Sequence, residues 1–415
     1  MDTNQQQLSV NLDPFSLSNI QEPYPYFTRL RKHHPVYWRA ENQFWMLSRY
    51  KDVKAALQLP ALFRSGTGPE ILRRAEALPA TTANAFNVCY KFWFTTILAT
   101  DPPQHTTQRI AITKAFTADV IADMRKAIEN RVVQLLDAIE EEGEIDFVRS
   151  FAHPLPSGVI FDILGIPEES HDTIRQMSMW LTRFPGAVLH GDQQMIENIA
   201  ERVRAAELVL KSIIALRRKS PSKDLISRLV NEPDPEARMS PDEIMVQVSF
   251  LLFAGHETTT NLLSGAMRHL LQQRSLWVEL LDTPELLGNA VNELLRFVSP
   301  VLWVTRLLSG DHDIDGIVLK SGTRVQLGLG AANHDPEQYS SPETLHLRRE
   351  NPSSLAFGYG PHYCIGASLA KLEIQISLAS LLQRFPNIEL NTTTFDYQPA
   401  YWMRSLKSLP VRIDG

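Results

Sequence analysis

The sequence predicts a mainly α-helical protein with a small β-sheet region, organised as one large domain over residues 1–415. Helix signals run through most of the chain, whereas strand-like alternation is confined to residues 312–330. No Gly/Ser-rich linker, repeat or long charge run divides the sequence, and the Pro-rich segment 231–243 is short enough to connect two helices. Apolar residues make up 44% and charged residues 21%, which is the balance of a globular protein with a sizeable core.

The longest expected helix covers the apolar run 244–271. Ser240 can cap its start, Pro241 suits the first helical position, and Glu243 stands three residues after the cap, so that the three form a capping box. The run is too polar in its middle to span a membrane. It suits a long buried helix.

Other segments give a second helix start, the strands and an ambiguous region. Thr283 and Pro284 begin a helical pattern over 285–298. Residues 312–330 contain Asp-Gly and Ser-Gly turns between alternating residues, which predicts a small sheet. The aromatic segment 86–96 lacks clean helical or strand periodicity, so core packing and a binding surface both stay open for it.

The most informative stretch is FGYGPHYCIG at 357–366, which places Cys364 in a glycine-rich turn. Gly358, Gly360 and Gly366 allow a tight backbone path whose amide N–H groups can point at the sulfur. A helical pattern starts directly after the cysteine and adds its positive end. Both effects are expected to lower the pKa of the thiol, which predicts a thiolate ligand for iron.

Other uses of Cys364 fit less well. A structural zinc site needs about four Cys or His ligands in paired spacing, whereas the other cysteine, Cys89, is far upstream and the chain has no CxxC. A cysteine protease needs a histidine that the fold brings to the sulfur, and His362 is too close in sequence for that geometry. A buried free cysteine is the remaining alternative.

The segment 357–366 resembles the haem-binding loop of the cytochrome P450 family, and the family's other signatures follow in the expected order. The resemblance implies a helical domain of the cytochrome P450 type that binds haem b. It implies that Cys364 is the axial thiolate ligand of the iron and favours O–O cleavage in dioxygen. It also places Phe357, Gly358 and Gly366 around the cofactor and makes His362 a donor to a haem propionate.

A second signature, AGHETT at 254–259, lies in the middle of the expected long helix. Ala254 and Gly255 lack bulk, so a flat cofactor could lie against the backbone there. Glycine and threonine weaken a helix, which predicts a local bulge opened toward a ligand.

The resemblance implies chemical roles for two residues of this signature. Thr258 would hydrogen-bond bound oxygen, and Glu257 would relay protons inward. The alternative is a solvated polar face, but apolar residues on both sides and the cysteine motif disfavour it. His256 receives no catalytic role.

Cofactor carboxylates need basic partners, and the resemblance implies a set of four. Arg favours bidentate contacts with carboxylates, although each of these residues alone would more often be a solvated surface residue. The set consists of His105 and Arg109, four residues apart on an expected helix, together with Arg306 and His362.

Glu293 and Arg296 match the structural E-x-x-R pattern of the family, which is buried and supports the loop before the haem cysteine. The sequence departs from the family at Thr344, where arginine is usual. The third partner of the pair is therefore open between Arg348 and Arg349.

The resemblance places the segment 86–96 as a loop and short helix over the distal haem face, where substrates are selected. The substrate-pocket candidates are all large or branched apolar residues, which suggests a medium-to-large apolar substrate. They are Phe92, Phe94, Phe250, Val301, Trp303, Tyr401 and Trp402.

Composition narrows the partners and the location. The net charge of −6 argues against nucleic-acid binding, and two cysteines argue against a secreted disulfide scaffold. The N-terminus shows neither a signal pattern nor a membrane anchor. The chain thus resembles the soluble bacterial class of the family, and we expect a cytoplasmic monomer.

The resemblance implies a monooxygenase that inserts one atom of dioxygen into an organic substrate. Electrons would come from NAD(P)H through a ferredoxin reductase and a ferredoxin, and the substrate would be a secondary metabolite, free or tethered to a carrier protein. A peroxide-dependent peroxygenase of the same fold is the alternative, although such enzymes typically lack the pair that Glu257 and Thr258 supply. A non-catalytic haem sensor is a further alternative.

Overall fold

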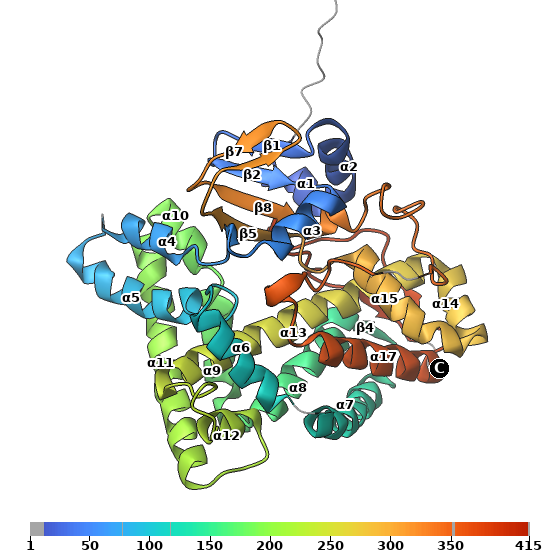
Figure 1. Cartoon of the computed structure of the whole chain (residues 1–415). Coiled ribbons are helices and arrows are strands. Elements are labelled where there is room, and N and C mark those ends of the chain that lie inside the picture. The colour runs from blue at the N-terminus through green and yellow to red at the C-terminus, as the bar shows by residue number, and fades with distance from the viewer. Residues whose placement is uncertain (1–11, 77, 117, 351–352, 414–415) are drawn as a thin grey trace, which may run out of the picture.

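The computed structural model describes residues 12–76, 78–116, 118–350 and 353–413, and it confirms the mainly α fold with small β-sheets. Figure 1 shows the sheet of β1, β2, β8 and β5 at one end of the molecule beside α1, α2 and α3, with the long helices on the other side. Most of the polar N-terminal stretch, residues 1–11, lies outside the described residues.

The α-helices of the described residues have the following bounds: α1 (Leu17–Gln21), α2 (Pro23–His33), α3 (Tyr50–Gln58), α4 (Gly68–Ala75), α5 (Ala80–Phe94), α6 (Gln104–Ala115), α7 (Ala118–Ile139), α8 (Pro154–Leu164), α9 (His171–Leu181), α10 (Phe184–His190), α11 (Gln193–Lys219), α12 (Leu225–Val230), α13 (Pro241–Gln272), α14 (Arg274–Asp282), α15 (Leu287–Val298), α16 (Leu329–Ala332) and α17 (Ala367–Arg384). Short 3₁₀ turns cover Glu168–Ser170, Pro284–Leu286 and Gly360–His362, and a π turn covers Val148–Ala152.

The strands are β1 (Val36–Arg39), β2 (Phe44–Leu47), β3 (Phe63–Arg64), β4 (Glu144–Asp146), β5 (Trp303–Leu308), β6 (His312–Ile314), β7 (Ile317–Leu319), β8 (Arg324–Gly328), β9 (Glu389–Leu390) and β10 (Pro410–Arg412). Five of them form a sheet in the order β1-β2-β8-β5-β3, in which only β2 and β8 pair in parallel. Three more form the sheet β4-β10-β9, and β6 pairs with β7. The strands predicted within 312–330 are therefore confirmed.

Helix α13 begins as predicted. The Ser240 side chain accepts a hydrogen bond from the backbone N–H of Glu243, and the Glu243 carboxylate accepts one from the N–H of Ser240, so the capping box is complete. The helix is buried on nearly all sides, as expected of a helix that lies inside the protein. It packs on α5, α8, α11, α15 and α17, which brings several elements of the site together.

Two expected elements differ from the structure. The helix expected from residue 285 begins with the 3₁₀ turn Pro284–Leu286 and becomes α-helical at Leu287. Such 3₁₀ turns are frequent at the N-termini of α-helices. The segment 86–96, expected as a loop with a short helix, lies mostly in the single helix α5, whose aromatic side chains pack on both sides. That two-sided packing hid the helical period in the sequence.

Candidate functional site

The loop before α17 holds Cys364 in a constrained backbone. Gly358 and Gly360 have φ of +70° and +71°, which side chains on L-residues rarely tolerate. A Cβ at Gly360 would also lie 2.6 Å from the carbonyl oxygen of Leu57 in α3. The Cys364 N–H donates to the Phe357 carbonyl at 2.9 Å and closes the loop. The glycines therefore serve the path that the sequence predicted.

The pKa of the Cys364 thiol differs from the expected direction. Burial raises the pKa of this thiol, and the hydrogen bond from the Gly366 N–H and the charge of Arg109 do not outweigh that effect. The loop does lower the pKa through the Gly366 N–H, as the sequence predicted, but the sequence did not show that burial has the larger effect. Binding of a metal ion would favour the thiolate, because the ion displaces the proton. The other cysteine, Cys89, is fully buried, and burial raises its pKa to about 12.

Two histidines from distant parts of the chain meet beside this loop. The rings of His105 in α6 and His362 lie 4.1 Å apart between centroids. Nε2 of His362 lies 3.0 Å from the Ser65 hydroxyl, while Nε2 of His105 is buried and has no hydrogen-bond partner among the described residues. Asp101 holds the backbone N–H groups of Ser65 and Gly66 and so fixes the position of the Ser65 hydroxyl.

Two arginines add positive charge to the same place. Arg306 in β5 is 6% exposed, and its side chain donates to the carbonyl of its neighbour Thr305. Arg109 in α6 donates to the Tyr363 carbonyl at 2.8 Å. Neither forms an ion pair with a described carboxylate. Burial lowers the pKa of Arg306 to about 10, and burial together with Arg306, His105 and Arg109 lowers the pKa of His362 to about 3.

This basic cluster has the chemistry to bind an anionic group. Buried cations without carboxylate partners are costly, and the unpaired Nε2 of His105 is a further unsatisfied group. The propionates of a haem would supply both the negative charge and the acceptors. The residues therefore fit haem, with the thiol of Cys364 as the candidate iron ligand.

The Glu293–Arg296 pair lies in the interior. Both side chains are 0% exposed and joined by two hydrogen bonds of 2.7 and 2.8 Å. Arg349 is the third partner, because its Nε lies 3.0 and 3.1 Å from the two carboxylate oxygens of Glu293. Arg348 instead pairs with Glu279 in α14. Arg296 also donates to the Asn333 carbonyl at 2.8 Å and thus ties α15 to the segment that follows α16.

One face of α13 is left uncovered in the middle of the protein. From residue 244 to residue 271 the side chains are buried, except for a half-buried set in the centre of the helix. Five of them follow the spacing i, i+3, i+4, i+7 and i+8, so they share one helical face. They are Phe250, Phe253, Ala254, Glu257 and Thr258. A half-buried face on an otherwise buried helix indicates an internal space beside it.

Gly255 does not belong to that face. A Cβ at this position would lie 3.1 Å from the side chain of Ile160 in α8, so glycine suits the close contact of the two helices. A cofactor contact at Gly255 stays a prediction. The predicted bulge is also absent, because α13 is a continuous α-helix from Pro241 to Gln272. The Thr258 hydroxyl instead donates to the Ala254 carbonyl at 2.8 Å within its own turn.

Glu257 is tied to the histidine next to it. Its Oε1 lies 3.0 Å from Nε2 of His256, and Nδ1 of His256 lies 3.0 Å from the Leu252 carbonyl. Burial alone would raise the pKa of Glu257, but the hydrogen bond with His256 and the charges of His256 and His153 outweigh it, so the pKa is lowered. No catalytic role was predicted for His256 from the sequence. Its contact with Glu257 depends on side-chain orientations that the motif does not show.

Aromatic rings from two other segments lie beside Phe253 on the uncovered face of α13. The Trp93 ring lies 6.0 Å from that of Phe253, which in turn lies 6.4 Å from that of Trp402. Sequence reasoning missed Phe253. The only available signal was its position one turn before Glu257, on the face shared with Phe250.

Several substrate-pocket candidates lie elsewhere. Phe92 and Trp303 are 1% and 3% exposed and pack in the core, Trp303 against Phe27. Phe94 packs against Phe184. These three are corrected to core residues.

Two further candidates lie near the C-terminal segment. Tyr401 and Trp402 both pack against the hydrophobic cluster beside the large sheet. The Tyr401 ring lies 4.6 Å from the Phe15 ring, whereas the Trp402 ring lies 6.4 Å from the Phe253 ring of α13. Of the two, Trp402 is therefore the one seen beside α13, and Tyr401 stays a prediction. Val301 is half-buried and forms an isolated bridge with Met403.

The family model for cytochrome P450 matches residues 20–281 and 270–399. The chain belongs to the cytochrome P450 family. It is 33% identical over 402 residues to the polyketide biosynthesis cytochrome P450 PksS of Bacillus subtilis, with 94% of this chain and 96% of the relative covered. It is 32% identical over 384 residues to a steroid C26-monooxygenase of Mycobacterium tuberculosis, with 92% and 98% covered. The solved structure of P450BioI in complex with hexadec-9Z-enoic acid ligated acyl carrier protein matches with a TM-score of 0.86 and 30% identity, covering 96% and 100% of the two chains.

This cytochrome P450 is accordingly a haem-dependent monooxygenase of a family whose iron is bound by a thiolate. No helix among the residues that the structure describes has the length and apolar character needed to cross a membrane.

Proposed function

We propose that this cytochrome P450 hydroxylates or epoxidises a medium-to-large apolar substrate in the biosynthesis of a secondary metabolite. The observation that carries the proposal is the uncovered face of α13. There Ala254, Glu257 and Thr258 stand beside the apolar wall of Phe253, Trp93 and Trp402. An acid and an alcohol next to an aromatic wall suit oxidation of an apolar molecule.

The basic cluster and the cysteine loop would hold the cofactor. His105, Arg109, Arg306 and His362 would bind the haem propionates, and Cys364 would bind the iron. The haem, when bound, supplies dioxygen activation with a thiolate that favours O–O cleavage. Phe357 is half-buried and its carbonyl accepts from Cys364, so it would support the ligand loop.

Proton handling falls to α13. The hydroxyl of Thr258 now donates to Ala254, and rotation about its side-chain bond would free it to face a ligand. Oε1 of Glu257 and Nε2 of His256 lie 3.0 Å apart, so the two groups can share a proton. Glu257 could therefore take a proton from the His256 side and release it toward the uncovered face.

The source of electrons and the form of the substrate are also proposed. Electrons would come from NAD(P)H through a ferredoxin reductase and a ferredoxin, which bind transiently. The substrate would be a fatty-acyl or polyketide chain carried by an acyl carrier protein. This is supported by the polyketide biosynthesis relative and by the structural neighbour, which is bound to an acylated carrier protein.

The proposal is tested with haem-loaded protein, NADPH and surrogate redox partners under ¹⁸O₂. Matched long-chain acyl substrates are supplied free and linked to an acyl carrier protein, with a steroid as a third substrate. We expect one ¹⁸O atom per product molecule and higher kcat/KM for the carrier-bound chain. Equal turnover with hydrogen peroxide alone and none with NADPH would instead establish a peroxygenase, and preference for the steroid would exclude the acyl substrate.

A further inference from the structure

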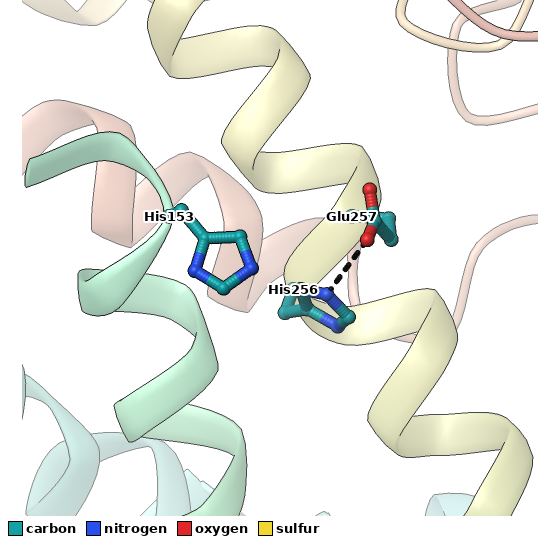
Figure 2. Close-up of side chains that lie close together, drawn as sticks. All are labelled: His153, His256 and Glu257. Atoms are coloured by element: carbon teal, nitrogen blue, oxygen red, sulfur yellow. Dashed lines mark hydrogen bonds and ion pairs between the residues drawn. The ribbon is translucent and has the colours of Figure 1, made fainter. Parts of the chain in front are cut away.

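Three potential metal ligands converge where the start of α8 packs on α13. Figure 2 shows the ring of His153 directed at α13, where His256 and Glu257 lie side by side. One ligand atom from each of the three lies within 4.8 Å of the other two. Two imidazoles and one carboxylate form a ligand set that zinc uses, with the fourth position left for water.

The contacts of His256 leave a place for either a proton or a metal ion between two of these groups. The Leu252 carbonyl can only accept, so Nδ1 of His256, 3.0 Å away, carries a proton. Nε2 of a neutral His256 is then an acceptor, yet it faces a carboxylate oxygen of Glu257 at 3.0 Å. Two acceptors at this distance need a proton or a metal ion between them.

The surroundings prepare the three groups for a metal ion. The bond from Nδ1 to a carbonyl orients the His256 ring and directs Nε2 outward, as is usual for histidine ligands. Ligand atoms around a tetrahedral zinc ion lie about 3.3 Å apart, from bonds of about 2.0–2.1 Å. His256 and Glu257 already meet that spacing. The His153 ring makes no hydrogen bond to a described residue, so it is free to turn and close the remaining distance.

The nearby charges do not oppose a divalent ion strongly. The charge of Arg175 lowers the pKa of His153. Arg175 itself forms an ion pair with Asp172 at 3.8 Å, and its guanidinium group lies over the Phe161 ring. The Glu257 carboxylate supplies negative charge at the site. The ring centroids of His153 and His256 lie 5.5 Å apart.

We propose that His153, His256 and Glu257 bind a divalent transition-metal ion, with zinc the best match to the ligand set. A metal ion here would hold the Glu257 carboxylate on the α8 side of α13. It would thereby prevent Glu257 from carrying protons to the uncovered face. This second consequence rests on the proposed function, whereas the binding itself does not.

Binding is measured by isothermal titration of the ferric, haem-loaded protein with Zn²⁺. We expect one zinc ion per chain in the native protein and affinity weakened by about tenfold or more in His153→Gln and in Glu257→Gln. His33→Gln, which changes an exposed histidine in another region, is the matched control and should bind as the native protein does. Unchanged affinity in both site variants would overturn the site.

Folding and function are separated by two further measurements. Haem absorbance and melting temperature without zinc show whether each variant is folded. Because the two variants change different segments, one of them still tests the site if the other does not fold. In the native protein zinc should slow substrate oxidation and EDTA should restore it, while His153→Gln should resist zinc. Oxidation unaffected by saturating zinc would leave the metal site standing and refute its inhibitory effect.

Discussion

At the scale of single residues, two groups of the site are not in the state that their proposed roles require. Burial raises the pKa of the Cys364 thiol, and the Thr258 hydroxyl is bonded within its own helix. The sequence identified both residues. Their resting states depend on burial and rotamer, which the motifs do not record.

The role of Cys364 is tested by Cys364→Ser. The reduced native protein with carbon monoxide should show the red-shifted Soret band of thiolate ligation, and the variant should lose it, because a serine hydroxyl is a poor substitute for the thiolate. Absorption spectra of both proteins at equal haem content make the comparison. An unshifted band in the native protein would exclude Cys364 as the axial ligand.

The role of Thr258 is tested by removing only its hydroxyl function. Thr258→Ala should keep haem content but divert much of the NADPH consumed to hydrogen peroxide, because proton delivery loses its alcohol. Thr258→Ser retains the hydroxyl and should stay coupled. Product and peroxide are measured per NADPH oxidised. Full coupling in the alanine variant would show that this hydroxyl does not assist proton transfer.

At the scale of elements, buried charge fixes how segments join. Glu293 in α15 binds both Arg296 and Arg349 and also accepts the N–H of His346, so one carboxylate organises the segment before the cysteine loop. The sequence left Arg348 and Arg349 as equal candidates. Adjacent residues on an irregular segment point to different sides, and only the fold determines which one faces inward.

The two arginines form a matched pair of variants. Arg349→Ala should lower the free energy of unfolding by about 1.5–3 kcal/mol, since it removes hydrogen bonds to a buried carboxylate. Arg348→Ala should cost under about 1 kcal/mol, because its ion pair with Glu279 is half exposed. Denaturant titrations of the haem-loaded proteins measure both. Equal losses would contradict the assignment of Arg349.

Helix α17 contains a buried carboxyl group that makes stability depend on pH. Glu373 is 1% exposed, its Oε2 has no partner among the described residues, and burial raises its pKa to about 8. Because the folded pKa lies above the unfolded value of 4.5, the native state binds the extra proton. Its stability is thus complete below about pH 4.5 and falls as the pH rises toward 8.

Glu373→Gln removes that dependence, because the amide stays neutral. The variant should gain stability over the native protein as the pH rises from 5 to 8, by on the order of a few kcal/mol. Chemical denaturation at several pH values measures the difference. A difference that stays constant across this range would show that Glu373 is not protonated in the folded protein.

At the scale of the whole molecule, the sequence predicted the helical fold, the capping of α13 and the residues of the basic cluster. It did not separate the neighbours Phe92 and Trp93, or Tyr401 and Trp402, because each pair is equally apolar and the partners that divide them come from distant segments. The meeting of His153 with His256 was hidden for the same reason. Tertiary packing determines which way such side chains point, and the sequence shows only which residue types are present.

The enclosure of the uncovered face by α5, α13 and the C-terminal segment gives a test of the whole arrangement. Trp93 is half-buried and lies against Phe253, so Trp93→Ala should weaken substrate binding or change the position of oxidation while leaving haem content intact. Phe92 is 1% exposed in the core, and Phe92→Ala should instead cost about 3–5 kcal/mol of stability.

Substrate titrations followed by the Soret shift, product analysis and thermal melts are made on both variants. Because the two residues are adjacent on the same helix, a general loosening of α5 would affect both measurements in both proteins. A Trp93 variant that melts early with unaltered affinity, or a Phe92 variant that melts normally and changes product, would reverse the assignment. The face of α5 turned to α13 would then be core, and the apolar wall of the site would have to be sought around Phe250 and Trp402.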